Sequence, residues 1–291
     1  MDRLLECALF VVGLAFGSFL NVCISRIPRG QSVVTPPSHC PRCDAGIRWY
    51  DNVPLLSWLL LRGRCRHCGE RISFRYPTVE LLTAVLFVAC YVRFGLAWLT
   101  LKVCIFVFLV VGLIFTDAEA GLLPREFTYI GMVLGLGFSW IAPTDSGATA
   151  FLLHLFGQPL PTEHLLSLLD AILGGLVGAG FFYLAWALYY LVRKTHGLGF
   201  GDIALMGMSG AFLGLKMIVL VIALAPVTSV FYIAFLFLRE AFKPAAELTE
   251  QNDTHKSFLG REIPFGVFLG SCSLLAVFAG ELIWTWYLGM F

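Results

Sequence analysis

Charged residues are scarce in this sequence. Only 13% of its 291 residues are Asp, Glu, Lys or Arg, whereas 58% are hydrophobic and 26 are Phe. A soluble domain carries roughly a quarter charged residues, because charges cover its surface. The shortage excludes an ordinary soluble protein and indicates that the lipid bilayer surrounds most of the chain. We expect no nucleic-acid partner.

We expect the sequence to have no cleavable signal peptide. The apolar run at residues 4–24 is too long for the hydrophobic region of a signal, and no small-x-small cleavage site follows it. We therefore expect this run to be retained as the first transmembrane helix.

The remaining apolar runs predict an all-α polytopic membrane protein, since a bilayer core takes about 20 apolar residues of helix. The sixth run is short and bordered by Gly, so it could be a half-span or be continuous with its neighbour. About eight spans are expected, at residues 4–24, 77–92, 96–116, 126–142, 166–192, 203–215, 217–238 and 264–289.

The positive residues predict the orientation of these spans. Residues 25–77 hold nine Arg against three acidic residues, and such an excess is typical of a cytoplasmic segment. Alternation from there leaves the loop at 143–165, which has no Lys or Arg, on the outer side, together with both termini. It also brings Asp117 and Asp202 to the cytoplasmic face.

Four of the nine cysteines form two C-x-x-C pairs, Cys40–Cys43 and Cys65–Cys68. Two such pairs at this separation are typical of a structural zinc site with four thiolate ligands. A redox dithiol is the alternative, but the pairs lack the βαβ setting of thioredoxin-like proteins. We predict a Zn²⁺ ion that a domain of about fifty residues needs in order to fold.

The two aspartates are candidates for catalysis, because carboxylates at membrane depth are costly. Two carboxyl groups that face each other can share a proton, so that one activates water and the other stabilises the tetrahedral oxygen. Gly199 and Gly201, just before Asp202, would allow close approach of an extended substrate. A simpler interpretation is that each acid ends a span or reaches the interface; the pairing of two acids at one face argues against it.

Several motifs, in order along the chain, resemble those of the bacterial prepilin peptidases, or type IV leader peptidases, which are membrane aspartic proteases with a G-x-G-D motif. They lie at residues 17–22, 40–43, 51–58, 62–68, 72–77, 80–82, 117, 123–124, 199–202 and 263–266.

The resemblance implies a substrate and a second activity. Members cut the basic leader from type IV prepilins and type II secretion pseudopilins at the cytoplasmic face of the bacterial inner membrane. They then N-methylate the new terminal residue with S-adenosylmethionine as the methyl donor. Asp117 and Asp202 correspond to the catalytic acids. The sequence itself gives no location for the S-adenosylmethionine site.

Two features depart from the family pattern. Arg125 follows Leu-Pro where the family usually has an aspartate, and residues 143–165 form an insertion. The expected division is a first helix at 1–24, a cytoplasmic Cys₄ zinc domain at 25–76 and a transmembrane peptidase domain at 77–291. Two alternatives stay open: a peptidase alone, whose zinc domain docks the substrate, and a membrane adaptor of a secretion assembly without catalysis.

Overall fold

The structure is a computed structural model that describes residues 2–195, 199–241 and 264–290. Within these ranges the chain is helical, and its extended contacts are two isolated bridges rather than strands. Two short 3₁₀ helices occur at Ile27–Arg29 and Trp49–Asn52. The α-helices are α1 (Asp2–Arg26), α2 (Leu56–Leu60), α3 (Arg75–Phe94), α4 (Trp98–Ala120), α5 (Arg125–Ile141), α6 (Gly147–Leu155), α7 (Glu163–Arg193), α8 (Phe200–Ala241) and α9 (Phe265–Leu288).

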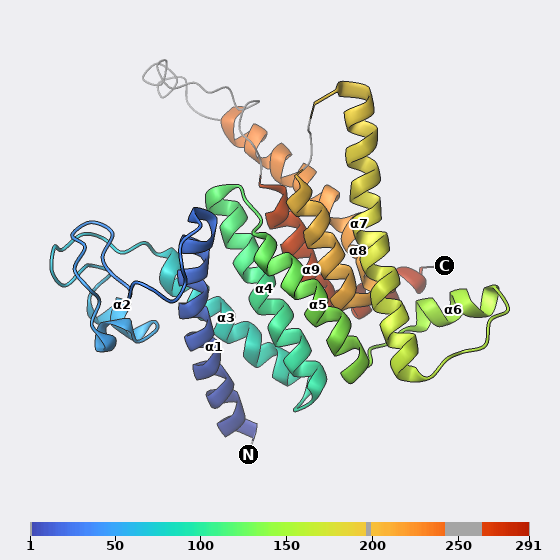
Figure 1. The fold of residues 1–291 in the computed structure, drawn as a ribbon, viewed down its shortest axis with the longest axis horizontal. Helices are drawn as coiled ribbons and strands as arrows, with labels where there is room; N and C mark the ends of the chain where they lie inside the picture. Colours follow the sequence, from blue (N-terminus) through green and yellow to red (C-terminus); the bar gives the residue numbers. More distant parts are fainter. Residues whose placement is uncertain (1, 196–198, 242–263, 291) are drawn as a thin grey trace.

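The long helices form one bundle, and the segment between α1 and α3 lies to one side of it, beside α1 (Figure 1). Within the bundle α1 packs on α3, α4 packs on α9, and α8 packs on α5, α7 and α9. This arrangement confirms the prediction of an all-helical membrane protein with a cysteine-containing segment between its first two long helices.

The prediction of eight spans is not confirmed. Six helices in the described ranges are long and apolar enough to cross a membrane: α1, α3, α4, α7, α8 and α9. The expected span at 126–142 is α5, which has only 17 residues. The expected spans at 203–215 and 217–238 both lie in α8, and their boundary falls beside Gly214, which is not helical.

Helix α8 is divided into two arms at Gly214, whose φ of 78° is not helical. Ser209 accepts a hydrogen bond from Ser273 of α9 at 3.2 Å, and Thr228 lies 3.5 Å from the sulfur of Cys272. A straight helix would separate Ser209 and Thr228 by roughly 28 Å, yet both contact adjacent residues of α9. The second arm therefore runs back alongside the first.

Small residues allow the helices to approach closely, as is usual in membranes. A Cβ on Gly17 of α1 would lie 2.6 Å from the Cα of Glu80 in α3, and one on Gly13 would lie 2.5 Å from the Cα of Ala84. A Cβ on Gly178 of α7 would lie 2.5 Å from the carbonyl oxygen of Met206 in α8. The first-span motif thus gives α1 and α3 a contact between backbones.

Polar contacts lie at the end of the bundle where α8 turns. Asp170 of α7 accepts a hydrogen bond from Thr149 at 2.6 Å and another from the backbone N–H of Leu215. Lys102, which is 1% exposed, donates to Ser139 at 3.0 Å. These bonds satisfy buried polar groups and hold the insertion and the turn of α8 against the bundle.

Candidate functional site

The two candidate acids lie at helix ends that meet at the opposite end of the bundle. Asp117 is in the last turn of α4, which ends where Gly121 adopts φ +62°. Asp202 is in the first turn of α8. Their exposed fractions are 6% and 8%, and the two carboxyl groups lie close enough for their negative charges to repel each other. The structure therefore brings together two buried acids that are 85 residues apart in the sequence.

Asp117 is held by the start of α9. Its Oδ2 accepts a hydrogen bond from the backbone N–H of Val267 at 3.1 Å. The first N–H groups of a helix have no partner within that helix, so a carboxylate from another segment can satisfy them. A Cβ on Gly266 would lie only 2.8 Å from the same oxygen. The Pro-Phe-Gly sequence at 264–266 thus starts α9 and leaves room for Asp117.

Leu123 lies between two glycines of this site. A Cβ on Gly201 would lie 2.7 Å from the Cβ of Leu123, and one on Gly266 would lie 3.0 Å from its Cδ1. Gly199 is close to Asp202, because a Cβ added to this glycine would lie 3.3 Å from the Oδ2 atom of the acid. Gly201 therefore has a packing role, while the role of these glycines in substrate access stays a prediction.

Aromatic rings from α7 lie beside the two helix starts at this end. The ring of Trp186 is 5.0 Å from that of Phe200, and the ring of Phe182 is 6.0 Å from that of Phe265. Phe200 itself is 59% exposed. The acids are therefore bordered by apolar surface, which suits contact with a hydrophobic peptide segment.

The four cysteines of the two C-x-x-C pairs come together in the segment between α1 and α3. All four sulfur atoms lie within 4.8 Å of one another, and those of Cys40 and Cys68 are 3.8 Å apart. Four sulfurs placed tetrahedrally at about 2.3 Å from a Zn²⁺ ion would be about 3.8 Å apart. The donor set and its spacing fit a metal ion with four thiolate ligands.

The two pairs are built in the same way. The N–H of Cys40 bonds to the carbonyl of Ala45, and the N–H of Cys65 to that of Glu70, five residues on in each case. Residues Asp44 and Gly69 occupy equivalent positions with positive φ. The backbone N–H groups of Cys68 and His67 lower the pKa of Cys65 to about 7, whereas burial and the neighbouring thiols raise the pKa of Cys68 to about 12. A lower pKa favours the thiolate, which is the form that binds metal.

Two further contacts hold this segment together and attach it to the bundle. Arg66 donates two hydrogen bonds to Asp51, at 2.8 and 2.6 Å, and holds the pKa of that carboxyl below its usual range. The backbone N–H of Leu55 donates at 2.8 Å to Glu80, a buried residue of α3. Glu80 therefore joins the cysteine-containing segment to the pair of helices α1 and α3.

Comparison with known proteins identifies the family. Residues 11–94 match the family described as the bacterial peptidase A24 N-terminal domain, and residues 103–234 match the type IV leader peptidase family. A protein of Aeromonas salmonicida strain A449 called prepilin leader peptidase/N-methyltransferase is 32% identical over 308 residues, covering 96% of this chain and 92% of that protein. The chain belongs to the type IV leader peptidase family.

Other relatives of this leader peptidase family member carry the same name. The protein of Bacillus subtilis strain 168 is 31% identical over 285 residues, 97% of each chain. That of Myxococcus xanthus strain DK1622 is 43% identical over 205 residues, but the match covers 70% of this chain and only 55% of that protein. No solved structure matches the chain.

In this leader peptidase family member, the residues predicted from sequence form two groups, the aspartates with their glycines and the four cysteines. Two hydrogen bonds are not predicted from the sequence. One runs from the backbone N–H of Val267 to Asp117, and the other from the backbone N–H of Leu55 to Glu80. Both donors are backbone groups, which leave no mark in the amino-acid sequence. Arg125, the departure from the family pattern, is an exposed residue at the start of α5.

Proposed function

We propose that this chain cleaves the leader peptide of type IV prepilins and type II secretion pseudopilins, with Asp117 and Asp202 as its catalytic acids. The observation that supports this most is the meeting of two buried carboxyl groups at the ends of α4 and α8, bordered by apolar surface. Membership of the type IV leader peptidase family and the names of the relatives agree with it.

The two carboxyl groups would act as a pair. One carboxylate removes a proton from water, whose oxygen attacks the carbonyl carbon of the scissile peptide bond. The other carboxyl group, protonated, hydrogen-bonds to the carbonyl oxygen as it gains charge. A proton then passes to the leaving amine as the C–N bond breaks. The N–H of Val267 fixes the orientation of Asp117 during these steps.

The acids would work at the cytoplasmic face of the bacterial inner membrane. The arginine-rich segment that follows α1 favours this orientation, since positive residues collect on the cytoplasmic side. A basic leader would leave the membrane at this level. The chain would then comprise the first helix at 1–24, a cytoplasmic domain at 25–76 and the peptidase domain at 77–291.

The metal held by Cys40, Cys43, Cys65 and Cys68 would be Zn²⁺ in a structural role. Four thiolates leave no open coordination position for a substrate. The repeated turns around the two pairs direct the four sulfurs at one point, and Glu80 attaches the resulting domain to the bundle.

A second activity would be N-methylation of the terminal residue exposed by cleavage. S-adenosylmethionine would supply the methyl group. Several relatives that match more than nine-tenths of this chain have N-methyltransferase in their names. The attachment of the zinc domain near the start of α3 would keep it close to the new terminus, because Arg75 pairs with Glu119, two residues after Asp117.

The decisive experiment incubates the purified protein in lipid with a prepilin and S-adenosylmethionine and measures the intact mass of the product. We expect Asp117→Asn and Asp202→Asn each to reduce leader removal by at least about 10³-fold, as removal of a catalytic group does. Glu126→Gln is the matched control, because Glu126 is an exposed acid in the first turn of α5.

Each outcome has a definite meaning. Loss of cleavage in both Asn variants, with the control active, supports the pair of acids. Full cleavage by either Asn variant would show that the catalytic assignment is wrong. A cleaved product without an added methyl group would support the alternative of a peptidase that has no methyltransferase activity.

A further inference from the structure

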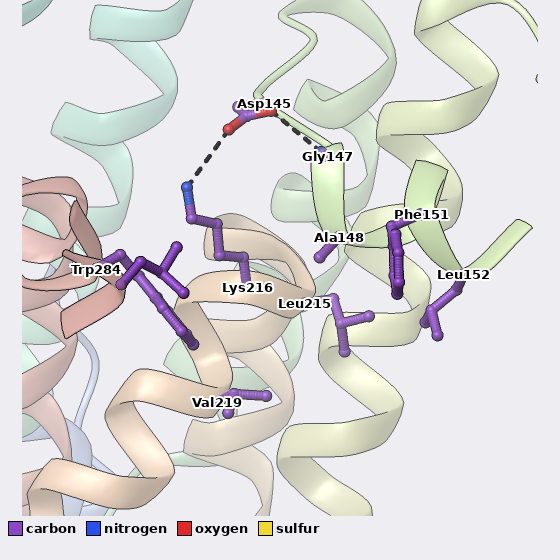
Figure 2. Close-up of a pocket in the computed structure, with 10 residues that line it drawn as sticks. Asp145, Gly147, Ala148, Phe151, Leu152, Leu215, Lys216, Val219 and Trp284 are labelled. Carbon is purple, nitrogen blue, oxygen red and sulfur yellow. Dashed lines mark hydrogen bonds and ion pairs between the residues drawn. The ribbon is translucent and has the colours of Figure 1, made fainter. Parts of the chain in front are cut away.

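A pocket lies at the end of the bundle opposite the two aspartates. It is an open groove with a volume of about 480 Å³, lined by α6, the beginning of the second arm of α8 and the end of α9 (Figure 2). This size is within the range of roughly 300–1,000 Å³ that is usual for sites of small molecules. The insertion at 143–165 provides one wall of the pocket through α6.

The walls are apolar. They are formed by Ala148, Phe151, Leu152, Leu215, Val219 and Trp284. Phe151 is 67% exposed on α6, a helix too short to span a membrane, so this helix suits a position in the bilayer interface. Tryptophan, here Trp284, is also typical of the interface between membrane and water. A pocket of this kind, open at the edge of a membrane protein, fits a hydrocarbon chain.

Charged groups lie at one side of the pocket. Lys216 pairs with Glu281 at 2.7 Å and with Asp145 at 3.6 Å. Figure 2 shows the Lys216 side chain extending from α8 toward Asp145, which also accepts a hydrogen bond from the N–H of Gly147 at 3.1 Å. The side chains of Glu281 and Asp145 are 44% and 67% exposed. Together these three residues carry one excess negative charge.

We propose that this pocket binds a phospholipid with an ammonium headgroup, namely phosphatidylethanolamine. One acyl chain would occupy the apolar walls, the ammonium group would pair with Asp145 and Glu281, and the phosphate would lie against Lys216. The excess of acid over base disfavours an anionic lipid, because like charges repel at short distance. A bound lipid would join the insertion to α8 two residues beyond the turn at Gly214.

Native mass spectrometry of the full-length protein, released from nanodiscs that contain equal amounts of phosphatidylethanolamine and phosphatidylglycerol, tests this proposal. Val219→Trp would fill the pocket. Val227→Trp is the matched control, because Val227 is a valine of the same helix that lies outside the pocket and is 49% exposed, against 42% for Val219. Asp145→Asn removes one charge and leaves the apolar walls intact.

We expect the wild type and the control to retain phosphatidylethanolamine in preference to phosphatidylglycerol. Val219→Trp should lose most of the retained lipid, and Asp145→Asn should bind it about fivefold more weakly, as loss of one exposed ion pair allows. Equal retention of the two lipids, or preference for phosphatidylglycerol, would overturn the proposal. So would a Val219→Trp protein that retains as much lipid as the control, and if that variant does not fold, Asp145→Asn decides.

Discussion

The backbone N–H of Val267 donates a hydrogen bond to the Oδ2 atom of Asp117 at 3.1 Å, across 150 residues of sequence. Through this bond a carboxyl group at the end of α4 satisfies a donor in the first turn of α9. The position of the candidate acid therefore depends on where a different helix begins. Gly266, one residue earlier, keeps the space that this contact needs.

Gly266→Ala should reduce prepilin cleavage by about 100-fold, because the new Cβ would lie 2.8 Å from Asp117 Oδ2 and displace it, and a displacement of about 1 Å costs that much in rate. The measurement is the rate of leader removal at saturating substrate. Gly137→Ala is the control, since a Cβ at Gly137 of α5 has no atom within 4 Å. A Gly266→Ala enzyme with normal activity would contradict the role given to this contact.

Gly214→Ala should destabilise the protein by about 1–3 kcal/mol, because alanine at φ +78° is strained and its Cβ would overlap the Asp170 carboxyl group. Thermal unfolding in detergent measures the change. Gly180→Ala, at a position of α7 with open space around it, should leave the midpoint close to that of the wild type. An unchanged midpoint for both variants would mean that the turn of α8 tolerates a side chain.

Cys65→Ser should lower the affinity for zinc by at least about 100-fold and make residues 30–74 sensitive to protease. Loss of even an outer partner of a metal ligand costs about 10–100-fold, and this change removes a ligand. Zinc content per protein and limited proteolysis report the two effects. Cys7→Ser, in an exposed position of α1, serves as the control and should retain its zinc.

Glu80→Ala should weaken the attachment of the cysteine-containing segment by about 1–3 kcal/mol, because the N–H of Leu55 loses its acceptor. Hydrogen exchange at the Leu55 amide measures this directly. Glu80→Gln keeps a carbonyl oxygen at the same place and should retain most of the protection. If the amide of Leu55 exchanges at the same rate in all three proteins, Glu80 does not hold the segment.

Much of this architecture follows from the sequence. The apolar runs locate the long helices, and alternation of loops between the two sides brings Asp117 and Asp202 to one end without any knowledge of packing. The two C-x-x-C pairs predict the four-sulfur cluster because two-residue spacing lets both thiols of a pair reach one point. These features depend on composition and spacing, which are local properties of the chain.

Other features depend on geometry that composition does not encode. Hydropathy detects two apolar runs around Gly214. It does not reveal that the backbone of this one residue is not helical and turns the chain between the two runs. The contacts of Val267 and Leu55 involve backbone N–H groups, which every residue other than proline has. The close packing of Gly201 against Leu123 likewise depends on contacts between distant segments, which the sequence does not reveal.

The turn at Gly214 also constrains how the chain enters the bilayer during synthesis. The first arm of α8, residues 200–213, is about 21 Å long at 1.5 Å per residue, whereas the hydrocarbon core is about 30 Å thick. An arm this short cannot be integrated as an independent span. We therefore expect the translocation machinery to release both arms as one hairpin, so that Asp202 reaches its final depth only after the second arm has left the ribosome.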